Sequence, residues 1–135
     1  MGYRILEHTA DVRLLVEGQT LEELFGEALK GMMEVLKPEK KEGGAEITRK
    51  IEIEAAGRTE LLVDFLNEVL WLAHTHHEAF TSVLFGEISE KRLKAELRGS
   101  PAEGFGEDIK AVTYHEAEIR RNAAGNLETM LVFDI

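Results

Sequence analysis

Hydrophobic residues recur at helical spacing in two segments of the chain. From Leu21 onward they follow one another at intervals of three and four residues, which places them on one face of a helix. Thr20 and Glu23 form a capping box in front of this run, and Pro38 ends it. A second run, Thr59 to about His74, shows the same spacing with more apolar positions. We predict that these two segments are the main helices.

The remaining apolar positions alternate with polar ones, the pattern of half-buried strands. The predicted strands are Tyr3 to Leu6, Val12 to Val16, Ile47 to Ala55, Phe80 to Ile88, Arg92 to Leu97, Ile109 to Arg120 and Leu127 to Ile135. Loops are expected at Glu39 to Glu46 and at Gly99 to Glu107, where glycine, proline and charged residues gather. Two helices among mostly consecutive strands predict an α+β fold. We expect one domain over residues 1–135, a two-layer sandwich with the helices packed on a mostly antiparallel or mixed sheet.

Size and composition narrow the class of protein. The chain has 135 residues, 44% of them hydrophobic and 31% charged, as in an ordinary soluble domain. Its apolar stretches fall short of the roughly 20 residues needed to cross a bilayer, and the first residues lack the apolar region of a signal peptide. The absence of cysteine excludes disulfides, thiolate metal sites and thiol nucleophiles. We therefore expect a cytoplasmic protein that does not bind membranes.

The formal net charge of −10 bears on the partners of this chain. Binding to nucleic acid rests largely on Lys and Arg side chains that neutralise phosphates, and an acidic surface repels those phosphates. Ordinary solubility is the simplest explanation of the acidity. We expect no direct sequence-specific binding of nucleic acid, so a role in RNA metabolism would run through a protein partner or a metal ion.

The final residues combine an apolar strand with two carboxylates. Asp134 carries one on its side chain, and Ile135 supplies the terminal carboxylate of the sequence. Adjacent fixed carboxylates repel each other unless a cation lies between them, and hard oxygen ligands suit Ca²⁺, Mg²⁺ or Mn²⁺. If Asp11 converges on the same point, three carboxylates form a divalent site. An ordinary last strand with a solvated end is the alternative, and spacing alone favours it.

Two further groups of residues could carry chemistry. Lys110 and His115 fall in a late predicted strand and could contact phosphate, ligate a metal or relay a proton, and His8 precedes Asp11 between two strands. His74, His76 and His77 end the second predicted helix, where imidazoles either complement the helix dipole or bind zinc. The helix dipole is the better explanation, because His76 and His77 point apart on a helix. The sequence shows no nucleophile–base motif, P-loop or dinucleotide fingerprint, so no catalytic residues are predicted.

Four segments, taken in order, resemble the archease family. They are His8-Thr9-Ala10-Asp11-Val12 with Thr20-Leu21-Glu22-Glu23, then Leu61-Leu62-Val63-Asp64-Phe65-Leu66-Asn67-Glu68-Val69-Leu70, then Lys110-Ala111-Val112-Thr113-Tyr114-His115, and finally Val132-Phe133-Asp134-Ile135. The resemblance covers the chain from Arg4 to Ile135. Any one segment would be modest support, and their common order makes the resemblance specific.

This resemblance implies an accessory protein in tRNA splicing that is not itself an enzyme. Archeases stimulate the RtcB-type RNA ligase, promoting its guanylylation and its multiple turnover and broadening its use of nucleotide triphosphates. The family's metal site carries over to Asp11, Asp134 and Ile135, with calcium as the ion seen in family structures and Mg²⁺ or Mn²⁺ as alternatives in function. Lys110, His115 and His8 are further candidates for contact with the partner or with phosphate.

Two other classes of function remain open from the residues. The first is a general chaperone or modulator of nucleic-acid-modifying enzymes, which would protect unrelated clients and be indifferent to Asp134. The second is a metal-dependent hydrolase using Asp11, His115 and Asp134, which would turn over substrate without a partner.

Overall fold

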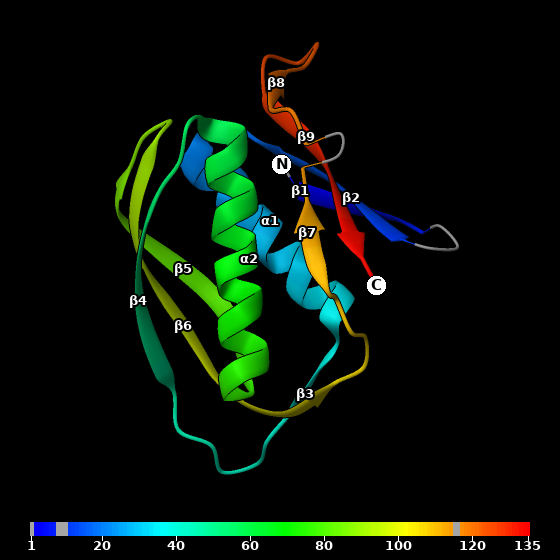
Figure 1. Ribbon diagram of the computed structural model, residues 1–135, viewed down its shortest axis with the longest axis vertical. Coiled ribbons are helices and arrows are strands. Elements are labelled where there is room, and N and C mark those ends of the chain that lie inside the picture. The colour runs from blue at the N-terminus through cyan, green and yellow to red at the C-terminus, as the bar shows by residue number, and fades with distance from the viewer. Residues whose placement is uncertain (1, 8–10, 115–116) are drawn as a thin grey trace.

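A computed structural model describes residues 2–7, 11–114 and 117–135 and confirms the α+β class (Figure 1). Every strand pairing among these residues is antiparallel, and the strands divide into two sheets, whereas the sequence pattern predicts one. No helix in the described part of the chain is both long and apolar enough to span a membrane.

The first sheet joins the two ends of the chain. Its order is β1-β2-β9-β7, with the short strand β8 also paired to β9. These strands are β1 (Gly2–Glu7), β2 (Asp11–Gly18), β7 (Ala111–Thr113), β8 (Arg120–Arg121) and β9 (Leu127–Asp134). Buried and partly exposed residues alternate along β2, so one face of the sheet packs on the core and the other faces outward.

The second sheet is built around β6 (Arg92–Phe105). Its other strands are β3 (Pro38–Lys40), β4 (Ile47–Glu54) and β5 (Glu78–Ile88), each paired with β6. The loop expected at Gly99 to Glu107 is therefore wrong, because β6 continues through it. The loop expected from Glu39 also begins as a strand, since the longer β6 gives β3 a partner.

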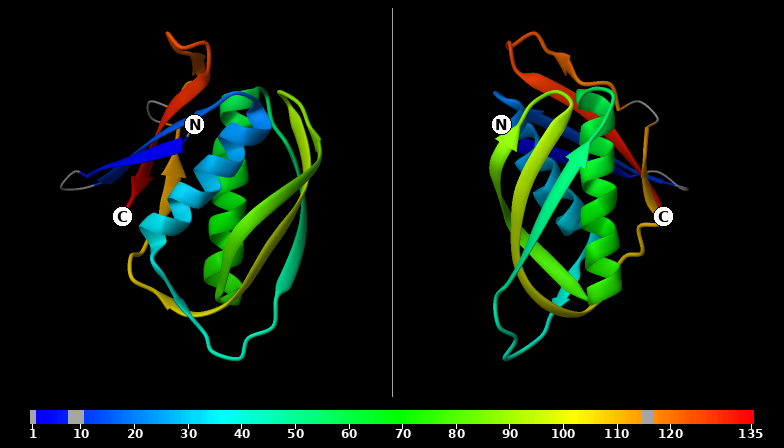
Figure 2. Two further views of the ribbon diagram at one scale, coloured as in Figure 1. Left: turned by 180° about the vertical axis from the view of Figure 1, so that it is seen from behind. Right: turned by 60° about the vertical axis from the view of Figure 1, so that its left-hand side comes forward.

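The helices α1 (Leu21–Leu36) and α2 (Arg58–His76) lie between the two sheets (Figure 2). The predicted start of α1 is confirmed, because the Thr20 hydroxyl accepts a hydrogen bond from the Glu23 N–H at 3.1 Å. Helix α1 ends where Lys37 takes a left-handed conformation, with φ 51°, directly before Pro38. On its sheet side, a Cβ on Gly31 would lie 2.6 Å from the Leu14 side chain, so glycine lets α1 approach β2 closely.

An aromatic cluster joins both helices to the second sheet. The Phe65 ring of α2 lies 5.6 Å from the ring of Phe25 in α1 and 5.9 Å from that of Phe85 in β5. Phe25 and Phe65 are fully buried. Since Phe25 also belongs to the helix that packs on β2, the two sheets share one hydrophobic core.

Candidate functional site

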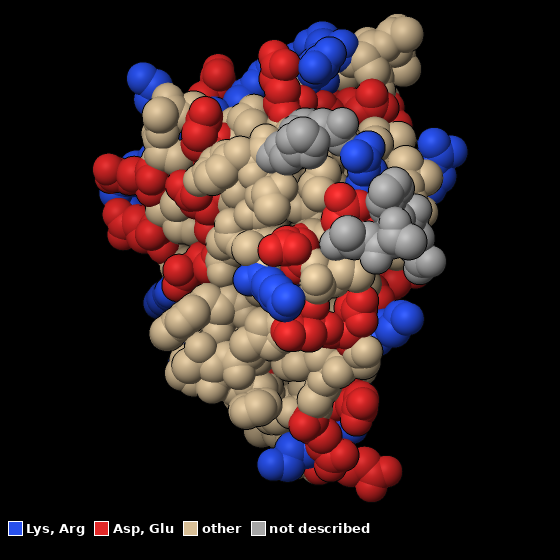
Figure 3. Space-filling model, turned by 45° about the vertical axis from the view of Figure 1, so that its right-hand side comes forward, with Lys and Arg blue, Asp and Glu red and all other residues tan. Residues whose placement is uncertain are grey.

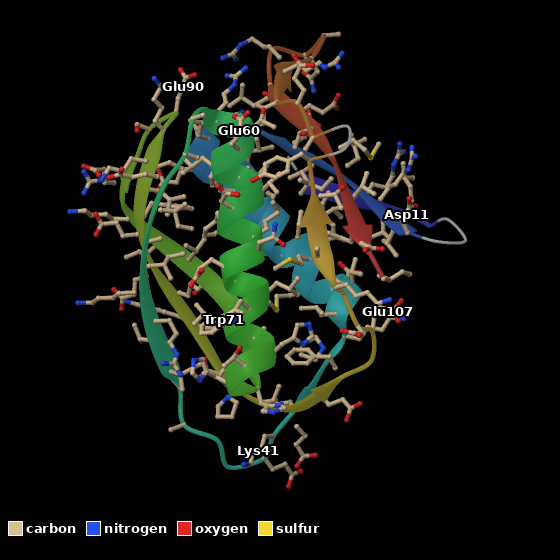
Figure 4. All side chains as sticks on the ribbon, in the orientation of Figure 1. Asp11, Lys41, Glu60, Trp71, Glu90 and Glu107 are labelled. Carbon is tan, nitrogen blue, oxygen red and sulfur yellow. The ribbon has the colours of Figure 1, made fainter. Side chains whose placement is uncertain are left out.

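The two aspartates predicted to converge are neighbours across adjacent strands. Asp11 begins β2 and Asp134 ends β9, and the antiparallel register places them directly opposite each other. Facing residues in such a pair have Cβ atoms roughly 5 Å apart on the same side of the sheet. Asp134 is exposed, whereas Asp11 is only partly exposed and its Oδ1 atom is buried. Figure 4 shows Asp11 beside the C-terminal end of β9.

Strand β7 flanks Asp134 on its other side. Ala111 is the register partner of Asp134 in this pairing, and the backbone N–H of Lys110 donates a hydrogen bond of 2.7 Å to the Asp134 carbonyl oxygen. Asp134 is thus held in a strand that has neighbours on both sides. The structure places the Lys110 backbone next to the aspartate pair, while the Lys110 side chain is exposed to solvent.

These residues have the chemistry of a site for a hard divalent cation. Asp11 and Asp134 contribute two carboxylates on facing positions, and carboxylate oxygens are the ligands that Ca²⁺ and Mg²⁺ prefer. The side chain of Ile135 packs against the core, which restrains the residue that follows Asp134. Among the described residues no three His, Asp or Glu side chains are grouped as a metal cage.

Acidic side chains are spread over the face that carries β7 and β9, with basic side chains interspersed among them (Figure 3). This distribution agrees with the net charge of −10. Such a surface attracts cations and basic protein surfaces and repels free phosphates.

Polar side chains of α2 hold the segment that follows Lys110. The amide of Asn67 makes two hydrogen bonds with the backbone of Val112: its Nδ2 donates to the Val112 carbonyl at 2.9 Å, and its Oδ1 accepts from the Val112 N–H at 2.9 Å. Further along the segment, the Thr59 hydroxyl accepts from the Ile119 N–H at 3.0 Å, and Arg58 donates to the Ile119 carbonyl at 3.0 Å. These bonds join both ends of the segment to α2.

The strand predicted from Ile109 to Arg120 is therefore interrupted. Its described residues form only β7 and β8, and between them the backbone of Ile119 bonds to the side chains of Thr59 and Arg58 in α2. Neither Asn67 nor Thr59 has a predicted role from the sequence. The only signal in the sequence is that polar residues interrupt the apolar run of α2.

Tyr114 extends this contact between the segment and α2. Its hydroxyl donates a hydrogen bond to the carboxylate of Asp64, which lies one turn before Asn67. This hydrogen bond, with smaller contributions from burial and from the charges of Asp64 and Glu60, raises the pKa of Tyr114 to about 12. Tyr114 therefore stays protonated throughout the physiological pH range, and it acts as a hydrogen-bond donor rather than as a base.

Two of the described histidines, His74 and His77, line one pocket together with Asp108. His8 and His115 lie outside the described residues. His74 lies with its Nε2 3.9 Å from Asp108 Oδ1, while the ring of His76 packs edge-on against Trp71 at 5.9 Å. His77 ends α2 in a left-handed conformation. Of these three histidines, His76 makes its ring contact with Trp71, away from the pocket that His74 and His77 share.

Comparison with known proteins places the whole chain in one group. The Archease protein family matches residues 3–135. A protein archease of Methanosarcina mazei is 34% identical over 141 aligned positions, covering 98% of this chain and 95% of that protein.

Two solved structures share the fold. The solution structure of Methanobacterium thermoautotrophicum protein 1598 has a TM-score of 0.70 and 27% identity, with 99% of each chain covered. A crystal structure of a Thermotoga maritima archease, described as a possible chaperone, has a TM-score of 0.66 and 21% identity, with 96% of this chain and 94% of that chain covered. Sequence, coverage and fold agree, and the chain belongs to the archease family.

Proposed function

We propose that this protein is an accessory activator of an RtcB-type tRNA-splicing RNA ligase and is not itself an enzyme. In this proposal it promotes guanylylation of the ligase, supports its multiple turnover and broadens the nucleotide triphosphates that the ligase accepts. Membership of the archease family supports the accessory role. The pairing of Asp11 with Asp134 at one edge of the first sheet is the observation that carries the proposal for the site.

Asp11, Asp134 and the terminal carboxylate of Ile135 would hold a divalent cation, with Ca²⁺, Mg²⁺ and Mn²⁺ as candidates. When bound, such a cation supplies positive charge that offsets the charge of a triphosphate and its pyrophosphate leaving group. The protein's own contribution is rigidity. Asp134 sits in a strand paired on both sides, so its carboxylate is presented to a partner without a large ordering cost.

The acidic surface supports association with a basic protein. An RNA ligase must bind phosphates and so needs a basic surface, which an acidic partner can approach under electrostatic steering. Lys110 is exposed and its backbone bonds to Asp134, and in this proposal its side chain contacts the partner or its phosphates. We give His8 and His115 the same proposed role, although both lie outside the described residues.

The test is guanylylation of the ligase at limiting divalent metal, with wild type, Asp134→Ala or Glu128→Ala added. Glu128 is a matched control, because it is a carboxylate on the same strand that pairs with Glu17 instead of Asp11. We expect stimulation by wild type and by E128A and none by D134A, with all three proteins folded.

The outcomes separate the parts of the proposal. Equal stimulation by D134A would reject the role of the aspartate pair and leave the accessory role standing. No stimulation by wild type would reject the accessory role itself. Protection of unrelated aggregating proteins, unaffected by D134A, would instead support a general chaperone, and substrate turnover without the ligase would support a hydrolase.

A further inference from the structure

Strand β7 pairs with β9 along one edge, and along its other edge it is hydrogen-bonded to the side chain of Asn67 in α2. Its inner edge pairs with β9, from Ala111 opposite Asp134 to Thr113 opposite Val132. At its outer edge the Asn67 amide accepts a hydrogen bond from the Val112 N–H and donates one to the Val112 carbonyl, both at 2.9 Å. One side chain of α2 thus supplies the donor and the acceptor that the next strand of a sheet would supply.

Strand β7 and the residue before it contact the candidate site through the backbone of Asp134. Lys110, two residues before Val112, donates its N–H to the Asp134 carbonyl at 2.7 Å. On the far side of Asp134, the register partner is Asp11. A displacement of β7 would therefore move the backbone of Asp134 relative to Asp11 and would also move Lys110.

The chemistry of the asparagine amide suits this position. Asn carries a donor and an acceptor side by side on a short side chain, so it can satisfy both backbone groups of one residue. Aspartate has the same size, but when ionised it has no donor and turns a negative oxygen toward the Val112 carbonyl. Alanine makes neither bond. Asn67 is only partly exposed, so water does not replace these bonds freely.

We propose that Asn67 is a positioning residue for the Asp11–Asp134 site: it holds β7 in register against β9 and so fixes Asp134 and Lys110. The proposal deepens the proposed function, and it rests on that function only in taking the aspartate pair to bind a divalent cation. The effect of Asn67 on the positions of Lys110 and Asp134 does not require a bound cation.

The experiment compares Asn67→Ala and Asn67→Asp with Thr59→Val. Thr59 is a matched control, because its hydroxyl holds the other end of the same segment through the Ile119 N–H, away from Asp134. Two measurements are made on each protein: amide hydrogen exchange without metal, and calorimetric titration with Ca²⁺.

We expect both Asn67 variants to speed exchange of the Val112 and Lys110 amides by about tenfold and to weaken Ca²⁺ binding by about tenfold, the effect of losing one or two net hydrogen bonds. N67D should behave this way although its volume is unchanged. T59V should speed exchange at Ile119 and leave Lys110 exchange and Ca²⁺ affinity as in the wild type.

Wild-type exchange at Lys110 in both Asn67 variants would overturn the proposal, as would an equal loss of Ca²⁺ affinity in T59V. If the wild type takes up no Ca²⁺, the proposed metal role fails by itself. In that case the exchange rate of Lys110 still decides the positioning role, since that measurement contains no metal.

Discussion

At the scale of single residues, the site depends on which carboxylates face each other. Asp11 and Asp134 place two negative charges on directly opposed positions of an antiparallel pair, an arrangement that lowers stability in an ordinary sheet. On the same strand, the carboxylate of Glu17 accepts hydrogen bonds from Asn126 and Asn122, which lower the pKa of Glu17. A cation bound between Asp11 and Asp134 would offset this repulsion.

Tyr114 and Asp64 give a prediction on pH. The pKa of Tyr114 is raised from 10.0 to about 12 in the folded protein, so the unfolded chain loses this proton first as the pH rises. The stabilisation from this hydrogen bond is complete below pH 10 and is lost between pH 10 and about 12. Titration of tyrosinate absorbance in a Tyr3→Phe background isolates Tyr114, and Asp64→Asn should lower its midpoint toward 10.0. An unchanged midpoint would contradict the assigned hydrogen bond.

At the scale of elements, β6 departs most from the sequence prediction. Glycine and proline usually mark turns, and Gly99 and Pro101 therefore predicted a loop. In the structure Gly99 lies in the strand, where a Cβ would fall 1.9 Å from the carbonyl oxygen of Ala79 in β5. Pairing with β5 shifts register at this point, between Phe80 and Ser82. Gly99 thus permits a close approach of two backbones at a bulge, which is a second role of glycine in sheets.

Replacing Gly99 tests this explanation. Gly99→Ala should lower the free energy of unfolding by about 3 kcal/mol, because the backbone of β5 must move to admit the methyl group. Gly104→Ala is the control on the same strand, since a Cβ there meets nothing within 4 Å, and it should change little. Urea denaturation measures both. An equal change in the free energy of unfolding for the two substitutions would show that Gly99 is not needed for the close approach of β5 and β6.

At the scale of the whole molecule, one core connects two sheets through two helices. Phe65 contacts both Phe25 and Phe85 and is fully buried, so it links α1, α2 and the second sheet. The candidate site lies on the first sheet, whose strands β1 and β2 pack on α1. Stability of the site is therefore coupled to the core, although Asp134 itself is exposed.

Phe65→Ala should lower the free energy of unfolding by about 4 kcal/mol through loss of buried area and creation of a cavity. Trp71→Ala is the control on the same helix: Trp71 is 56% exposed, and its removal should cost less than about 1 kcal/mol. Thermal or urea unfolding distinguishes them. A similar loss in both variants would contradict the central position of Phe65.

The net charge makes a second prediction at this scale. If the acidic surface steers the protein to a basic ligase, the association rate should fall by about tenfold between roughly 0.05 M and 0.5 M salt, because exposed charges are screened over a Debye length. The dissociation rate should change less. Stopped-flow binding at several salt concentrations measures both rates. An association rate independent of salt would argue against electrostatic steering.

The sequence by itself determined the helices, most strands and the α+β class, because apolar spacing and caps such as Thr20 act within a few residues. It also identified Asp11, Asp134 and Ile135 as candidate ligands through their chemistry and the family resemblance. Only the tertiary structure decided that Asp11 faces Asp134, that β6 runs through Gly99, and that Asn67 serves as the missing neighbour of β7. Each of these depends on register or on contact between segments far apart in the chain, and local spacing carries no information on either.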